Sequence, residues 1–339
     1  MVRGSKITLN KATSHEVSNQ STLTPTFQEG FSSFIRYCKA KNLRDKTIQN
    51  YNEHFAIFIN YIKNYTTLRI TKDLKQTDIE NYILFLRNKN IRETSINCYL
   101  RSLRSITNYW VKTGLCHNVK VQLSKADKKQ KEIYTDDELL KLLQKPNISK
   151  CDFTTYRNWC IINFFVATGV RVSTLINIKI EDLDFKYERI LLSYTKSRKS
   201  YYVPMSNQLK DVLEEYLFFR KGDSNDYLFC NPYGEQMTAD SVKHAISKYN
   251  KARGVERKGL HAFRHTFAKK CVLNGVNVFV LQRLMGHSDL SVTKEYIDLN
   301  ANDLAVNINL YNPLETLTHP TTTNQAQKKQ AKRKKIRLS

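Results

Sequence analysis

The residues best suited to chemistry are two arginines, a lysine, two histidines and a tyrosine in the second half of the chain, namely Arg171, Lys196, His261, Arg264, His287 and Tyr296. Guanidinium groups bind phosphate oxygens through two hydrogen bonds at once, and helix N-termini also attract anions. Histidine and lysine transfer protons near neutral pH, and a tyrosine hydroxyl can act as a covalent nucleophile. This set of residue types favours phosphoryl transfer without an obvious metal site.

The short motifs that contain these residues are weak when each is taken alone. They are TGVRVS at 168–173, the single residue Lys196, HAFRHT at 261–266 and LMGH at 284–287. A glycine–x–arginine after a helix is common, and in a chain with 19 tyrosines a lone Tyr296 carries almost no information. The order and spacing of the whole set carry the argument, with Tyr296 nine residues after His287.

Two neighbouring features have simpler interpretations. His261 and His265 have the i, i+4 spacing seen in zinc sites, but no Glu follows His261 and no third ligand is nearby, so we do not expect a metal. We interpret His265 as a structural residue, and we expect Tyr201 and Tyr202 to pack within a hairpin.

Helical patterns dominate the elements that must position these residues. In the first third, capping boxes at Thr26 and Thr77 and apolar spacings over 46–62 and 93–113 predict four helices, the last ended by Gly114. Further on, a capping box at Thr135 precedes a strongly apolar helix over 156–167. An alternating pattern then predicts a β-hairpin over 189–205. Further helices are expected at 207–221, 239–252, 264–273, 278–285 and 292–299.

These patterns divide the chain into five parts: a flexible N-terminus (1–20), a helical domain (21–116), a basic linker (117–132), a second domain (133–315) and a basic disordered tail (316–339). The positive charge of the linker fits either a solvated spacer or a segment lying along a phosphate backbone. The fold class is therefore mainly α with a small antiparallel β-hairpin or sheet.

Composition points to a polyanionic partner. The 339 residues include 55 Lys+Arg against 31 Asp+Glu, a net charge of +24, which favours nucleic acid over a small neutral ligand. The longest apolar run, 159–170, is too short for a bilayer, and the N-terminus has no secretory pattern. Seven scattered cysteines without a C-x-x-C pair indicate reduced thiols in a cytoplasmic protein.

In their order and spacing the motifs resemble those of the tyrosine recombinases, the phage-integrase family with its Xer-like and Cre-like members. The stretch from Gly286 to Tyr296 is particularly Xer-like. The resemblance covers nearly the whole chain and implies an all-helical, SAM-like core-binding domain followed by an α+β catalytic domain. It departs at Thr174, where the family usually has an acidic residue, and at Asp298, where it often has histidine.

The resemblance also implies a role for each residue. Arg171 and Arg264 neutralise the scissile phosphate, Tyr296 attacks it and His261 accepts the tyrosine proton. Lys196 protonates the departing 5′ oxygen, and His287 forms a hydrogen bond to the phosphate. Lys199 is a second lysine of the hairpin, but Lys196 fits better because the family lysine ends the incoming strand.

The implied function is that of an integrase- or transposase-type site-specific DNA recombinase that cleaves and rejoins strands through a 3′-phosphotyrosyl intermediate, with no metal, ATP or other cofactor. A non-catalytic DNA-binding regulator on the same scaffold and a type IB topoisomerase are the alternatives. The complete residue set favours the enzyme.

The implied partners are double-stranded DNA and further copies of the chain, as a dimer on each site and a tetramer on two sites. The resemblance leaves open whether accessory DNA-bending or directionality proteins take part. No membrane partner is expected, and the implied location is the bacterial cytoplasm, at the nucleoid.

The segment after Tyr296 has a different period. In 304–310, LAVNINL, apolar and Asn residues alternate, which predicts a short strand. Such a strand can dock within its own subunit or add to the sheet of a neighbour. The resemblance favours the second, because members of the family exchange C-terminal segments between protomers.

Overall fold

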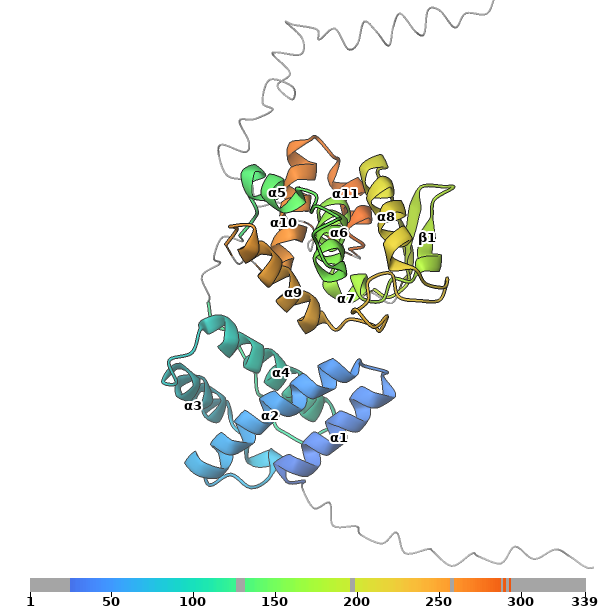
Figure 1. The fold of residues 1–339 in the computed structure, drawn as a ribbon. Coiled ribbons are helices and arrows are strands. Elements are labelled where there is room, and N and C mark those ends of the chain that lie inside the picture. The colour runs from blue at the N-terminus through green and yellow to red at the C-terminus, as the bar shows by residue number, and fades with distance from the viewer. Residues whose placement is uncertain are drawn as a thin grey trace, which may run out of the picture. The chain divides into compact units, whose positions relative to one another are not determined.

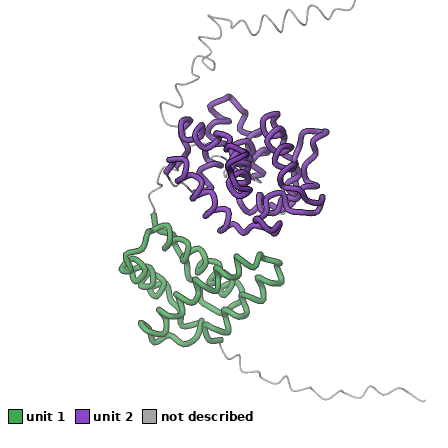
Figure 2. Tube along the Cα trace, viewed as in Figure 1, with its two compact units in different colours: residues 1–128 green, residues 129–339 purple. Residues whose placement is uncertain are grey.

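The chain folds into two compact units, residues 1–128 and residues 129–339 (Figure 2). The computed structural model describes residues 25–125, 132–195, 199–256, 259–287, 289–290 and 293. Each unit has its own buried apolar core. The expected fold class, mainly α with a small antiparallel sheet, is confirmed.

The first unit is built from four helices: α1 (Phe27–Ala40), α2 (Asp45–Tyr65), α3 (Gln76–Arg87) and α4 (Glu93–Lys112), with a 3₁₀ turn, η1 (Thr71–Asp73), before α3. Helix α4 packs against the other three. Trp110 of α4 is fully buried, and its ring lies 5.9 Å from that of Phe27 and 6.4 Å from that of Phe55, centroid to centroid. Aromatic side chains thus fill this core.

The helix starts follow the capping signals, with one exception. Capping boxes form at Thr26 and Thr135 as the sequence predicts. Helix α3 begins before Thr77, and Asp78 provides its cap by accepting the backbone N–H of Lys75 at 2.8 Å. The N-cap is thus Lys75, two residues before Thr77, and the carboxylate that caps the helix is Asp78 where the sequence suggested Glu80.

The chain that follows α4 packs against the first unit as far as Ser124. Val119 and Val121 are buried, and the carbonyl of Val121 accepts a hydrogen bond from Nε of Arg104 at 2.7 Å. Ser124 exchanges two hydrogen bonds of 2.9 Å with Asn97. The first part of the segment expected as a linker is thus attached to the helical unit, and residues 126–131 lie outside the described residues.

The second unit surrounds a central helix, α6. Its helices are α5 (Asp136–Leu143), α6 (Phe153–Thr168), α7 (Val172–Leu175), α8 (Asn207–Arg220), α9 (Ala239–Ala252), α10 (Leu260–Leu273) and α11 (Val278–Leu284). Helix α6 is apolar on nearly all sides, and α5, α8, α9 and α10 pack around it (Figure 1). An all-round apolar helix must be central because any exposed side would leave apolar surface in water.

A three-stranded antiparallel sheet in the order β1-β2-β3 lies at one edge of this unit (Figure 1). Its strands are β1 (Leu183–Asp184), β2 (Arg189–Leu192) and β3 (Tyr201–Pro204), with the 3₁₀ turn η2 (Ile180–Asp182) leading into β1. The β2–β3 pair is the expected hairpin, with Leu192 opposite Tyr201. The sequence did not predict β1.

Several predictions fall on residues that are not described. They are the flexible N-terminus (1–20), the tail (316–339), the strand at 304–310 and, apart from Thr293, the main part of the helix at 292–299. Within the described ranges, no helix is both long enough and apolar enough to cross a membrane.

Candidate active site

Arg264 is the buried centre of the candidate site. Helix α10 begins at Leu260, four residues earlier than expected, so both His261 and Arg264 are helical. Arg264 is 2% exposed. Its Nη1 donates to the carbonyl of Gly169 at 2.6 Å, and its Nη2 donates to the carbonyl of Met285 at 2.8 Å. Two backbone carbonyls from distant parts of the chain therefore fix the plane of the guanidinium group.

The Nη2 atom of Arg264 also lies 2.6 Å from Nε2 of His287. Because a guanidinium group can only donate, Nε2 must accept, and the proton of the imidazole is on Nδ1. That nitrogen lies 2.8 Å from Oγ1 of Thr293 and donates to it. Burial, reinforced by the positive charges of Arg264 and Arg171, lowers the pKa of His287 to about 3. His287 is therefore neutral at physiological pH, and it holds Arg264 together with two backbone carbonyls.

The turn before Arg171 requires a glycine at position 169. It ends α6 with φ +61°, in the left-handed region that side chains disfavour. A Cβ atom on Gly169 would also overlap the ring of Phe267 on α10. The turn brings the Gly169 carbonyl to Arg264 and leads directly into Arg171, the N-cap of α7. One tight turn thus provides an acceptor for Arg264 and positions Arg171 at the start of α7.

The side chain of Arg171 is half-buried. Its charge acts on His287, as the lowered pKa of that residue shows. Thr174, at the position where an acidic residue was expected, is buried in α7, and its backbone N–H donates to the Arg171 carbonyl at 2.9 Å. The backbone of this short helix therefore holds Arg171 in place.

The structure brings together Arg171, Arg264 and His287, and it places His261, whose side chain is exposed, in the first turn of α10. Lys196 and Tyr296 lie outside the described residues. Within the parts of the chain that are described, no group of three His, Cys, Asp or Glu side chains could hold a metal ion. The chemistry that this arrangement supports is binding of an anion by two arginines.

Two further residues border the site and were missed in the sequence. Thr293 is fully buried and fixes the tautomer of His287. Tyr201, the first residue of β3, lies against Gly286 next to His287. The strand alternation does predict that Tyr201 points inward, but its contact depends on a segment 85 residues away.

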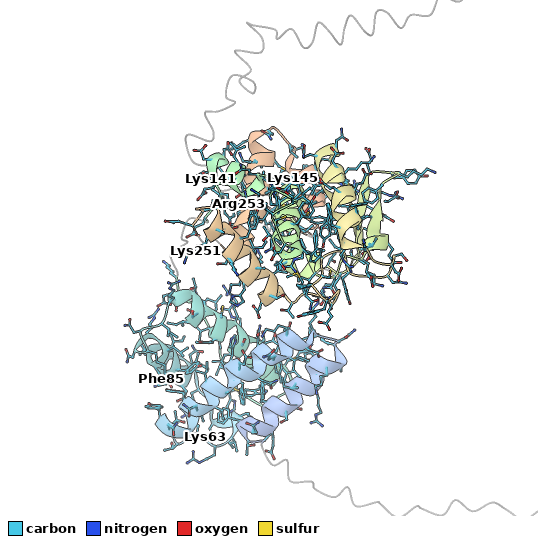
Figure 3. All side chains as sticks on the ribbon, in the orientation of Figure 1. Lys63, Phe85, Lys141, Lys145, Lys251 and Arg253 are labelled. Atoms are coloured by element: carbon cyan, nitrogen blue, oxygen red, sulfur yellow. The ribbon has the colours of Figure 1, made fainter. Side chains whose placement is uncertain are left out.

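Helix α9 carries a basic surface. Its exposed side chains are Lys243, His244, Lys248 and Lys251. At the end of this helix Arg253 donates to the carbonyl of Lys141 on α5 at 3.4 Å (both residues are labelled in Figure 3). Its guanidinium lies 5.0 Å from the centre of the Tyr249 ring. We call the four exposed residues the α9 basic face. Its charge suits a phosphate backbone.

Comparison with known proteins identifies relatives of both units. The phage integrase family matches residues 132–303, and the phage integrase N-terminal SAM-like domain matches residues 31–115. Tyrosine recombinase XerD of Oceanobacillus iheyensis is 25% identical over 278 residues, covering 79% of this chain and 92% of the relative. Tyrosine recombinase XerC of Thermodesulfovibrio yellowstonii is 35% identical over 179 residues, covering 50% of this chain and 58% of the relative.

Solved structures share the fold. The Tn1549 transposon integrase in complex with transposon right end DNA has a TM-score of 0.66 at 21% identity, covering 83% of this chain and 97% of that chain. A lambda integrase dimer bound to a core site has a TM-score of 0.65 at 17% identity, covering 81% and 96%.

The phage integrase match spans more than half of the chain, and the SAM-like match covers most of the helical unit before it. The described part of the candidate site lies inside the first match, with its arginines and histidines in the order of the motifs. The chain therefore belongs to the phage integrase family: it is a tyrosine-type site-specific recombinase, an enzyme that breaks and rejoins DNA.

Proposed function

We propose that Tyr296 cleaves DNA by forming a 3′-phosphotyrosyl bond in a site whose positive charge comes from Arg171 and Arg264. The observation that carries this proposal is that two backbone carbonyls and a neutral imidazole fix the buried guanidinium of Arg264, with the charge of Arg171 close by. A buried guanidinium group is stabilised when an anion binds to it. Negative charge builds on the non-bridging oxygens during phosphoryl transfer, so two fixed arginines lower the barrier.

The proposed reaction conserves the phosphodiester energy. The Tyr296 oxygen attacks phosphorus, the bond from phosphorus to the 5′ oxygen breaks, and the tyrosine proton passes to His261. Lys196 donates a proton to the departing 5′ oxygen. Attack by a 5′ hydroxyl on the phosphotyrosine reverses the sequence and releases Tyr296. The exposed position of His261 in the first turn of α10 supports its role as proton acceptor.

His287 has a supporting role in this scheme. Its Nε2 accepts from Arg264, so in this state the imidazole orients the arginine. A direct hydrogen bond from His287 to the phosphate requires Nε2 to carry a proton and to exchange Arg264 for a phosphate oxygen.

DNA binding is proposed to involve both units, with the α9 basic face and the linker on the phosphate backbone. The net charge of +24 supports this arrangement. Lambda integrase is a dimer on its core site and a tetramer on a Holliday junction. We propose the same assemblies for this chain, which would act on DNA inside a bacterial cell. We also propose the domain limits that the sequence predicts.

The test is covalent trapping. A pool of randomised duplexes, each with a nick that lets the cleaved fragment diffuse away, is incubated with the full chain, and DNA that stays attached after denaturation is sequenced. On a duplex selected in this way, Tyr296→Phe should bind DNA and give no adduct. Tyr233→Phe is the matched control, because Tyr233 is 88% exposed and distant in sequence from the motifs. An adduct with Tyr296→Phe, or none with the unaltered chain, would overturn the proposal.

A further inference from the structure

The ring of Tyr201 covers the turn that presents His287. Gly286 has φ +59°, and a Cβ atom built on it would overlap two ring carbons of Tyr201 and lie 2.5 Å from its hydroxyl oxygen. The ring edge therefore lies directly on the Cα atom of Gly286. Only glycine allows both this backbone conformation and this close approach.

Tyr201 also lies within the electrostatic reach of both arginines. Burial raises the pKa of its phenol, and the positive charges of Arg264 and Arg171 act in the opposite direction. The phenol is therefore protonated at neutral pH. Within the described residues the hydroxyl has no hydrogen-bond partner, so the contact that holds Tyr201 in place is the packing of its ring.

The contacts form a continuous path from the sheet to the arginine. Tyr201 packs on Gly286, the next residue is His287, and His287 accepts the hydrogen bond from Arg264. Met285, on the other side of Gly286, provides a second acceptor for the same arginine. Two acceptors of Arg264, the Met285 carbonyl and the His287 imidazole, thus flank the glycine that Tyr201 covers.

We propose that Tyr201 is a positioning residue of the recombinase site: its ring holds the Met285–His287 turn in the geometry that orients Arg264. This rests on the proposed function, in which Arg264 binds the scissile phosphate. The strand that carries Tyr201 is the outgoing strand of the β2–β3 hairpin, and the expected lysine, Lys196, lies between the two strands in the sequence. The ring therefore links the hairpin to the arginine site mechanically.

The neighbouring residue provides a matched control. Tyr202 is 53% exposed and points to the opposite face of the sheet, where its ring lies 4.4 Å from the guanidinium of Arg189. Tyr202→Ala removes an equal ring from the same strand without touching Gly286. Its cleavage rate should stay within about twofold of the unaltered chain.

The first measurement is single-turnover cleavage of a nicked duplex selected by covalent trapping. Tyr201→Phe keeps the ring and should cleave at nearly the normal rate. Tyr201→Ala should lose about 10- to 100-fold in rate while its DNA affinity is retained, because small displacements of a positioning group cost about that much. An equal loss of cleavage rate in both variants would mean that the hydroxyl is responsible. No loss in either variant would mean that Tyr201 has no positioning role. Both results contradict the proposal.

A double-mutant cycle tests the path through His287. If Tyr201 acts through this residue, Tyr201→Ala should have a clearly smaller additional effect on the cleavage rate when His287→Ala, which removes the acceptor for Arg264, is already present. A full additional loss in that background would show that the ring acts by another route, and the proposed path would be wrong.

The third measurement requires no DNA. The imidazole of His287 is followed by NMR in the full chain, with His287→Gln identifying its signal. In Tyr201→Ala the loosened turn should let water reach the ring, so the pKa of His287 should rise from about 3 toward its ordinary value, whereas Tyr202→Ala should leave it unchanged. An unchanged titration in Tyr201→Ala overturns the inference. If the unaltered chain forms no adduct, the proposed function fails and this titration alone decides the role of Tyr201.

Discussion

Acid should destabilise the second unit through His287. Burial and the charges of two arginines lower the pKa of this residue to about 3 in the folded chain, whereas an unfolded histidine titrates near 6.5. Below pH 6.5 the unfolded chain binds a proton that the folded chain excludes, so stability falls as the pH falls toward 3. The loss is about 1.4 kcal/mol per pH unit, or about 2 kcal/mol between pH 6.5 and pH 5.

The assay compares His287 with His287→Gln, whose amide oxygen can still accept from Arg264 but cannot titrate. The chain has two tryptophans: Trp110 is in the first unit, and Trp159 is buried in α6. In a Trp110→Phe background, fluorescence reports only the second unit, and urea unfolding is followed at pH 7.5 and pH 5. The acid-induced loss should be about 2 kcal/mol larger with His287 than with Gln.

His54, whose pKa is also lowered by burial, belongs to the first unit and does not enter this transition. Equal pH dependence in the two proteins would refute the reasoning. An NMR titration of His287 near pH 6.5 in the folded chain would do so as well.

Three further predictions concern DNA. Recombination should be complete in EDTA without nucleotide, because fixed arginines supply the charge, and an absolute Mg²⁺ requirement for strand cleavage would contradict this. DNA affinity should fall by about 10³ or more between 50 and 200 mM salt if six or more phosphates are neutralised. Replacing Lys248 and Lys251 by Ala should reduce the salt slope by about 2, while Lys145→Ala, whose ammonium already pairs with a carboxylate at 2.6 Å, should change it little. A flat salt dependence would count against backbone binding. Replacing Val306 and Ile308 by Asp should abolish synapsis of two sites and preserve single-site binding. Unchanged tetramer formation would contradict the exchange of C-terminal segments between protomers.

The helices could be predicted from the sequence because their apolar spacing and capping residues act locally. The short elements could not. β1 has two residues and α7 has four, too few to show a period. Helix α10 was expected to begin at Arg264, yet it begins at Leu260, where the N-cap is Gly259 and no side chain caps the helix, so no capping residue marks the start in the sequence.

The candidate site could be predicted at the level of residue types, and its contacts could not. Arg264 is recognisable from its motif, but its acceptors on Gly169 and Met285 are backbone carbonyls, which every residue has. Tyr201 was expected to pack in the hairpin, and the contact of its ring with Gly286 was not predicted. Which side chain fills the space above a glycine is decided by tertiary packing, not by local pattern.

The long span of the Arg264 contacts also orders events during synthesis of the chain. Arg264 takes one acceptor from 95 residues earlier and two from the segment 21 to 23 residues later. The Met285–His287 segment is synthesised after the helical unit and after most of the second unit, and domains generally fold as units. The guanidinium group of Arg264 can therefore bind all three of these acceptors only after the chain has been made as far as His287.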